Sequence, residues 1–396
     1  MKKILLNLIC VLLLLSIALS AIGCNVEESE ETLAPTEAAT EAPTEKPTEK
    51  PTQKPTEKPT EKNEGGSKLS YKTYDISKDW KYFKLVGRVF DVEGGVACDF
   101  TASGIEFEGV MNGEVTLSLS CDRNTYFTVY IDGERVDKRF FADAGTKELT
   151  IADFEDEAEH HVRVLKQTEP QWSLCVLKEL TVIGKLKEAP AKKDKYIEVI
   201  GDSITCGYGN LKIDGVSNSG ALYQDGTQTY AFLAAEALGA DASIVGCSGI
   251  GIDKGWTDFS ESDFYPKASF YRDKTGENYN FFRVPDLVII NLGTNDQSRG
   301  STEEDFKAGV RELIEFIRDS YGEDMPIVWA YNMMGNGRFD WTRTVLDDMG
   351  GEAEGLYSVE LVYNNQGGVG HPTLEAQIES SEILTKFIQD KGIFVE

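Results

Sequence analysis

The spacing of hydrophobic residues changes near residue 190, and this change most constrains the fold. Before it, short segments such as 115–120 and 126–131 alternate apolar and polar residues. After it, apolar runs of strand length alternate with segments that repeat apolar residues at helical spacing. Two-residue alternation predicts half-buried strands, whereas alternating strands and helices predict a parallel sheet. The chain is therefore predicted to contain two domains of different class.

Residues 68–186 are predicted to form an all-β domain, a small antiparallel sandwich of jelly-roll type. Asp132 and Gly133 follow the second alternating segment, and an Asp-Gly pair in this position is a strong hairpin signal. Residues 161–165 and 174–183 have the composition of further strands.

Residues 194–396 follow a linker rich in Lys, Ala and Pro, and they are predicted to form an α/β domain with a parallel sheet and helices on both faces. The expected strands are 196–200, 242–245, 286–292, 326–331 and 358–362. The expected helices are 229–238, one that includes 306–317, and 374–388. On the last helix, the expected inner face is Ile378, Ile383, Leu384 and Ile388.

The first 67 residues have the composition of a targeting segment and a stalk. Two lysines and an apolar run precede Ala21-Ile22-Gly23-Cys24, which resembles a bacterial lipoprotein cleavage site. The resemblance implies a signal peptide at 1–23, acylation of Cys24, and a cell-surface lipoprotein outside the cytoplasm. An ordinary signal peptide or an uncleaved anchor remains open. Repeats of Pro-Thr-Glu-Lys predict that 24–67 forms an extended, disordered stalk.

Charge and cysteine content exclude several classes of partner. The net charge of -27 repels phosphate backbones, so nucleic acid is not expected to bind. Beyond Cys10 and Cys24, the five remaining cysteines include no CxxC pair and no Cys/His cluster, so no metal site is expected. An oxidising environment allows one disulfide among them, with its partners left open.

Four polar blocks fall at predicted strand ends or loops on one edge of the parallel sheet. They are Gly201-Asp202-Ser203-Ile204, Cys247-Ser248-Gly249-Ile250-Gly251, Gly293-Thr294-Asn295-Asp296 and His371-Pro372-Thr373. Ligands of open parallel sheets bind at this edge. A serine hydroxyl needs a base to become a nucleophile, and His371 is the only histidine of the α/β domain. The blocks therefore predict a hydrolase that uses Ser203 and His371.

The order and spacing of these blocks resemble the SGNH hydrolases, or GDSL-type esterases, and the preceding β-domain extends the resemblance to carbohydrate esterase family 2. The resemblance implies a flavodoxin-like fold and no cofactor or metal. It also implies an oxyanion hole made of the Ser203 N–H, the Gly249 N–H and the Asn295 side chain, with Gly251 as an alternative to Gly249. Asp202 and Asp296 are expected to fix loops.

One position departs from the superfamily pattern. Gly368 stands where most members carry an aspartate three residues before the histidine, and 361–373 contains no carboxylate. The resemblance to the sugar acetyl esterases implies a reduced Ser–His dyad. We predict that a backbone carbonyl accepts the N–H of the outer nitrogen of His371.

The expected function is removal of O-acetyl groups from plant polysaccharides or oligosaccharides such as xylan and glucomannan, through an acyl-Ser203 intermediate. Trp329 and Tyr331, together with Trp256 and Tyr223, are candidates for stacking on sugars, although core packing is an equal alternative for Trp329. A lipase or thioesterase of other acyl specificity and a non-catalytic carbohydrate-binding lipoprotein remain alternatives. The expected partners are an acetylated saccharide and, through the lipid anchor alone, a membrane.

Overall fold

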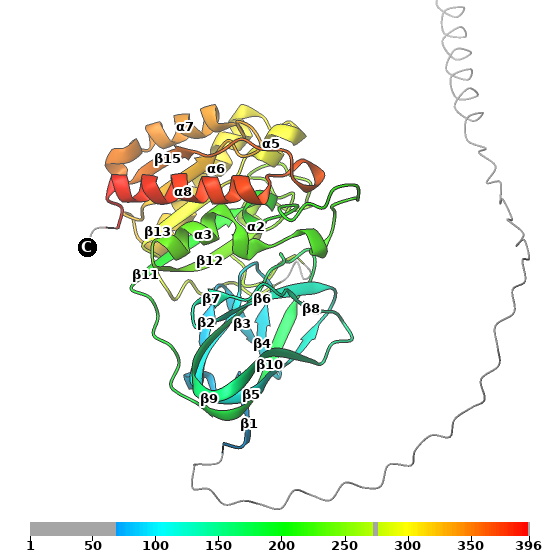
Figure 1. Ribbon diagram of the computed structural model, residues 1–396. Helices are drawn as coiled ribbons and strands as arrows, with labels where there is room; N and C mark the ends of the chain where they lie inside the picture. The colour runs from blue at the N-terminus through cyan, green and yellow to red at the C-terminus, as the bar shows by residue number, and fades with distance from the viewer. Residues whose placement is uncertain (1–68, 272–275, 395–396) are drawn as a thin grey trace, which may run out of the picture. The chain divides into compact units, whose positions relative to one another are not determined.

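The described chain begins with an all-β domain that is a single ten-stranded antiparallel sheet (Figure 1). The structure is a computed structural model that describes residues 69–271 and 276–394, so the predicted signal peptide, the stalk and Cys24 lie outside it. The strands are β1 (Tyr71–Asp75), β2 (Lys84–Val86), β3 (Val89–Val92), β4 (Gly95–Cys98), β5 (Gly104–Cys121), β6 (Thr125–Ile131), β7 (Glu134–Arg135), β8 (Phe140–Ala142), β9 (Glu148–Lys166) and β10 (Cys175–Leu186), with one 3-10 turn, η1 (Trp80–Tyr82).

The long strands β5 and β9 bend this sheet around a hydrophobic core. The strand order is β3-β4-β10-β5-β9-β6-β7, and β1, β2 and β8 pair with β10, β5 and β6. Register shifts interrupt the β5–β9 pairing between Met111 and Gly113, and such irregularities increase bending. The predicted hairpin is confirmed, because β6 pairs with β7 across Asp132 and Gly133, which have φ values of 53° and 89°. The all-β class that the alternation predicts is thus confirmed.

Three buried cysteines lie on neighbouring strands of this sheet. Cys175 on β10 is in register with Cys121 on β5 and with Cys98 on β4. The Sγ atoms of Cys121 and Cys175 are 2.6 Å apart, and both residues are free thiols in the structure. Cys121 and Cys175 are therefore the pair that an oxidising environment would join, a choice that the sequence leaves open.

The second half of the chain is a doubly wound α/β domain. Its five parallel strands have the order β12-β11-β13-β14-β15, the flavodoxin-like arrangement. The strands are β11 (Lys195–Gly201), β12 (Ala240–Gly246), β13 (Leu287–Asn291), β14 (Ile327–Tyr331) and β15 (Leu356–Glu360). The helices are α2 (Ser203–Cys206), α3 (Tyr230–Ala237), α4 (Glu261–Phe264), α5 (Thr294–Arg299), α6 (Glu303–Tyr321), α7 (Phe339–Asp348) and α8 (Leu374–Lys391), with 3-10 turns η2 (Ala221–Tyr223), η3 (Gly226–Gln228), η4 (Gly351–Glu354) and η5 (Gly368–Gly370).

Helices cover both faces of this sheet, as the sequence predicts (Figure 1). Side chains of α4, α6 and α7 form one core with Ile200, Ile290 and Trp329, whereas α3 and α8 form the other with Val199 and Ile289. Successive residues of one strand thus enter different cores, which explains why the central strands are apolar throughout. No helix in the described part of the chain is long and apolar enough to cross a membrane.

The prediction for the inner face of α8 is wrong at two positions. Leu384 and Ile388 are buried, but Ile378 and Ile383 are 42% and 37% exposed. Gln377 lies inside instead, because its Oε1 accepts from the Tyr230 N–H (2.8 Å) and its Nε2 donates to the Ile204 carbonyl (3.0 Å). A buried amide with partners for both ends can replace an apolar residue, and hydrophobic spacing does not reveal such a position.

Buried polar side chains join the two domains. Arg88, which follows β2, has no exposed surface, and its guanidinium lies 3.4 Å from the Glu198 carboxylate on β11. Arg88 Nη1 also donates to the carbonyls of Tyr265 and Lys267. Removing one partner of a buried ion pair typically costs about 3–5 kcal/mol, so these contacts hold the β-domain firmly against the α/β domain.

Candidate active site

Ser203 occupies the turn that follows the central strand β11. Asp202 caps α2 by accepting from the Ile204 N–H (2.9 Å), and Gly207 ends this short helix in the left-handed conformation. A Cβ on Gly201 would lie 2.1 Å from Thr205 Oγ1, so the turn needs glycine there. The side chain of Ser203 therefore stands at the carboxyl edge of the sheet, beside the β11–β13 switch point where ligands of this topology bind.

His371 reaches Ser203 from the loop before α8. Its Nε2 lies 2.8 Å from Ser203 Oγ, and its Nδ1 lies 3.2 Å from the Val369 carbonyl oxygen. The Val369 carbonyl can only accept, which assigns the proton to Nδ1 and leaves the Nε2 lone pair facing the serine hydroxyl. The predicted backbone carbonyl thus occupies the place of the usual carboxylate.

The conformation of this loop depends on two residues before His371. Val369 has φ 53° and ψ 33°, a left-handed conformation that β-branched residues rarely adopt. Gly368 has no positive φ, so its backbone conformation does not demand glycine, but a Cβ there would lie 2.6 Å from Asn218 Cβ and 3.0 Å from Gly209 Cα. Position 368 therefore requires glycine because Asn218 and Gly209 leave no space for a Cβ atom.

Restoring the missing acid by Gly368→Asp is expected to lower esterase activity. The new Cβ must displace Asn218 or Gly209, and the Val369 carbonyl moves with the loop. Gly368→Ala is the matched control, since it adds the same Cβ without the charge. We expect equal losses in kcat/KM from both variants. Higher activity in the aspartate variant than in the alanine variant would show that a carboxylate improves this dyad.

The activity should persist at a lower pH than an ordinary histidine would allow. Burial lowers the pKa of His371 below its usual 6.5, and the carbonyls of Val369 and Gly368 oppose this shift only in part. A general base works when it is neutral, so kcat/KM should fall only as the pH drops below 6.5. The measurement is a pH profile with an uncharged acetate ester. Burial raises the pKa of Asp202 to about 7. A fall in kcat/KM centred at that pH would therefore assign the titration to Asp202 instead of His371.

Donors for an oxyanion lie around Ser203. The Ser203 N–H is the first of α2 and has no acceptor within the helix. Gly249, just after β12, has φ 85°, and no acceptor for its N–H occurs among the described residues. Asn295 Nδ2 donates to Asp202 Oδ2 (3.0 Å) and to the Ile250 carbonyl (2.8 Å). The Asn295 amide must share or exchange one of these bonds to bind an oxyanion.

Asp202 and Asp296 both accept hydrogen bonds from neighbouring loops. Asp296 accepts from three successive N–H groups, those of Ile252 (3.0 Å), Asp253 (2.8 Å) and Lys254 (2.9 Å). Asp202 holds the Asn295 amide as well as the start of α2. These contacts are the ones that loop-fixing residues make, and they connect the serine, glycine and asparagine blocks to one another.

A cavity of about 920 Å³ opens at Ser203 and His371. Its other lining residues are Gln171, Tyr208, Ser248, Gly249, Trp256, Thr257, Asp258, Phe259, Tyr271, Thr294, Asn295, Ser298, Met334 and Val369. Trp256 is 66% exposed, and its Nε1 donates to Ser298 Oγ (3.1 Å). Trp256 therefore places an exposed indole in the cavity wall, with the Arg299 guanidinium over one ring face, 4.4 Å from the ring centroid.

The sugar-binding role expected for Trp329 is wrong, and Tyr331 lies outside the cavity at Ser203. Trp329 is completely buried in the core beneath the sheet, so the core-packing alternative is correct. Tyr331 stacks on Phe339 with ring centroids 3.6 Å apart and does not line the cavity. Sequence reasoning also missed Tyr208, whose ring centroid lies 4.8 Å from that of His371. Only its position five residues after Ser203 could have indicated it.

Comparison with known families places one match in each domain. Residues 85–190 match the carbohydrate esterase 2 N-terminal family, and residues 199–356 match the GDSL-like lipase/acylhydrolase family. A cellulase/esterase of Acetivibrio thermocellus is 25% identical over 320 residues, which are 76% of this chain and 38% of that protein. An acetylxylan esterase/glucomannan deacetylase of Cellvibrio japonicus is 27% identical over 76% of this chain and 88% of its own.

Solved structures share the same arrangement. A family two carbohydrate esterase from Clostridium thermocellum in complex with cellohexaose has a TM-score of 0.69 and 27% identity over 78% of this chain and 98% of its own. A family two carbohydrate esterase from Cellvibrio japonicus has a TM-score of 0.74 over 83% of this chain and 99% of its own. At 20% identity, this second likeness concerns the fold alone.

Proposed function

This chain belongs to carbohydrate esterase family 2 and carries a GDSL-type hydrolase domain, and on that premise we propose that it removes O-acetyl groups from polysaccharides or oligosaccharides. The observation that carries the proposal is the 2.8 Å contact between Ser203 Oγ and His371 Nε2 in the wall of an open cavity.

The reaction would proceed by acyl transfer to Ser203. His371 Nε2 takes the hydroxyl proton as Ser203 Oγ attacks the acetyl carbonyl carbon. Donors around Ser203, with the Asn295 amide among them, stabilise the oxyanion. The intermediate then expels the sugar oxygen, which receives the proton from His371. Water then attacks the acyl carbon as His371 takes its proton, and the C–Oγ bond breaks as Ser203 Oγ receives that proton, which releases acetate.

Two features support a saccharide substrate: the similarity to the Cellvibrio esterases and the exposed ring of Trp256. The names of the Cellvibrio proteins include acetylxylan and glucomannan. Sugar rings stack their C–H faces on aromatic side chains, and Trp256 presents such a surface in the cavity. Xylan and glucomannan are accordingly the proposed substrates.

A panel of esters tests this function. Acetylated xylan and glucomannan should release acetate, and aryl acetates should react faster than aryl butyrates or octanoates. Faster cleavage of long acyl chains would indicate a lipase or thioesterase instead. Saccharide binding without hydrolysis of any ester would indicate the non-catalytic alternative.

We also propose attachment to a membrane through a lipid on Cys24, in agreement with the lipoprotein-type sequence around it. Cys24→Ala is expected to abolish labelling by radioactive fatty acid and to leave the protein soluble or misprocessed. Cys10→Ala, in the predicted signal peptide, is the matched control and should still be labelled. Equal labelling of the Cys24 variant and the wild type would refute the proposal.

A further inference from the structure

We propose that Glu169, a residue of the β-domain, is a positioning residue for the oxyanion-hole loop Cys247–Ile250 of the α/β domain. The inference rests on the proposed function and concerns the same active site. It assigns part of the catalytic geometry to a domain that contributes neither the nucleophile nor the base.

The Glu169 side chain is completely buried, and its carboxylate accepts two hydrogen bonds from Ser248. One carboxylate oxygen accepts the Ser248 N–H, and the other accepts the Ser248 hydroxyl. Ser248 directly precedes Gly249, and the turn continues with a hydrogen bond from the Ile250 N–H to the Cys247 carbonyl (3.2 Å). Glu169 therefore holds the residue whose backbone sets the direction of the Gly249 N–H.

The same carboxylate is tied to the loop that follows the nucleophile. Glu169 Oε1 also accepts from Gln224 Nε2 (3.2 Å), and Gln224 Nε2 donates in turn to the carbonyl of Cys206 (3.0 Å), the last residue of α2. One buried group thus links the oxyanion-hole loop to the helix that begins at Ser203. Relative movement of the two would break these bonds.

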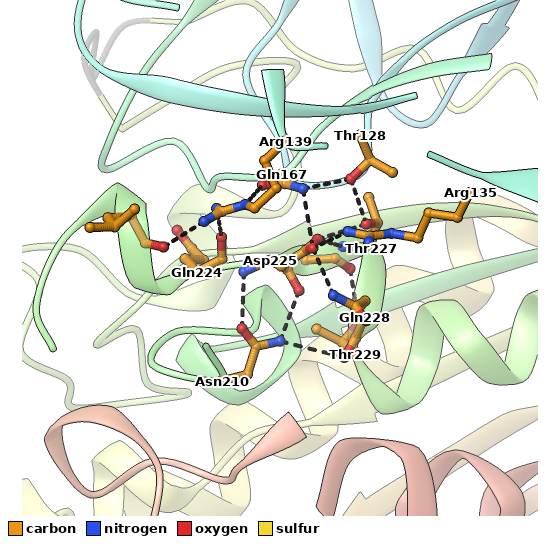
Figure 2. Close-up of polar contacts among 12 residues, drawn as sticks. Thr128, Arg135, Arg139, Gln167, Asn210, Gln224, Asp225, Thr227, Gln228 and Thr229 are labelled. Atoms are coloured by element: carbon orange, nitrogen blue, oxygen red, sulfur yellow. Dashed lines mark hydrogen bonds and ion pairs between the residues drawn. The ribbon is translucent and has the colours of Figure 1, made fainter. Parts of the chain in front are cut away.

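Further contacts from the β-domain hold Gln224 and its neighbour in place (Figure 2). Arg139 donates to the Gln224 carbonyl (2.8 Å) and to Gln167 Oε1 (2.7 Å), and Gln167 donates to Asp225 Oδ2 (3.1 Å). Arg135 forms an ion pair with the same Asp225 oxygen at 2.5 Å. Side chains of the β-domain therefore hold the segment that contains Gln224 through several hydrogen bonds and an ion pair.

Glu169 itself is fixed by its neighbour Lys166. Lys166 Nζ, which is buried, donates to the carbonyls of Asp99 (2.9 Å), Thr168 (2.5 Å) and Glu169 (3.3 Å). A carboxylate offers acceptors only, so it can accept the Ser248 N–H and hydroxyl together. Glutamine has the same shape, but its NH₂ group must face either the Ser248 N–H or the Gln224 Nε2–H group, and neither of these can accept a hydrogen bond. Glu169→Gln is therefore a conservative change that breaks one of the bonds by which Glu169 holds Ser248 and Gln224 together.

An oxyanion hole works because its donors are held in place before the charge develops. We expect Glu169→Gln to lower kcat for an aryl acetate by about 10-fold to 10²-fold, the usual result of a misplaced donor, while KM changes by less than about 3-fold. Affinity for phenylboronic acid, which forms a tetrahedral adduct with the serine, should fall with kcat. Ser248→Ala, which keeps the N–H bond, should show a smaller loss of the same kind.

Glu236→Gln is the matched control. Glu236 on α3 binds Arg163 of the β-domain through two hydrogen bonds (2.9 and 2.6 Å), away from the cavity. Its replacement should leave kcat within about 2-fold of wild type, because no oxyanion donor depends on it. Wild-type kcat in Glu169→Gln, or equal losses in Glu169→Gln and Glu236→Gln, would overturn the inference.

Ser248→Ala and the wild-type protein provide two further tests. If Glu169→Gln does not fold, unchanged kcat and boronate affinity in Ser248→Ala would overturn the inference, and a joint fall would support it. An inactive wild-type protein would instead refute the proposed esterase function, so the two failures are distinguishable.

Discussion

Ser203→Ala is expected to lower kcat/KM for aryl acetates by more than about 10³-fold, because Ser203 Oγ is the atom that attacks the acetyl carbon in the proposed reaction. The Ser203 side chain is small, and in the described part of the chain its hydroxyl forms a hydrogen bond with His371 alone, so the fold should be unaffected. Steady-state rates and circular dichroism spectra of the purified protein measure the two quantities.

The control for this variant lies in the same cavity. Ser298→Ala removes a hydroxyl that accepts from Trp256 Nε1 and donates to the Asn295 backbone carbonyl (2.8 Å), and that does not contact the reactive pair. It should retain activity within about 3-fold of wild type, as expected for a group that makes no bond in the transition state. Substantial hydrolysis by Ser203→Ala, in a preparation free of other esterases, would mean that Ser203 is not the nucleophile.

Asn295→Ala is expected to reduce kcat by about 10² to 10³-fold, the loss that accompanies removal of one oxyanion donor. KM should change little, because the donation is made to the transition state rather than to the substrate. The same substitution removes the bonds to Asp202 and Ile250, so thermal unfolding must be measured alongside the rates.

Asn365→Ala is a suitable control, since Asn365 lies in the loop that leads to His371 but outside the cavity. It should have near wild-type kcat. A rise in KM alone for Asn295→Ala would indicate that the amide binds substrate instead of the oxyanion. Asn295 Nδ2 already donates two hydrogen bonds, so kcat and KM together decide whether the amide binds the oxyanion or the substrate.

The proposed role of Glu169 gives the β-domain a part in the active site. A domain with an independent core could in principle serve only as a spacer or a binding module. Here it contributes Glu169 to the loop that carries Gly249, and it contributes Gln171 to the cavity wall. We therefore expect the isolated α/β domain to be a poor catalyst even if it folds.

Local sequence patterns determined the secondary structure and most of the topology. The alternation in 126–131 and the Asp132-Gly133 pair predict β6, β7 and their turn, because strand pleating and positive φ are local properties. The apolar run at 286–292 predicts β13, which is buried on both faces. Ser203 and Asn295 could be assigned to one edge because the carboxyl ends of parallel strands meet there.

The tertiary structure decided everything that depends on contacts between distant segments. Spacing could not distinguish the buried Trp329 from the exposed Trp256, since each is a single aromatic whose surroundings come from other elements. It could not identify the Val369 carbonyl, because backbone carbonyls occur at every residue and only the loop conformation aims one at His371. Glu169 lies 79 positions from Ser248, and nothing along the chain relates the two until the domains pack together.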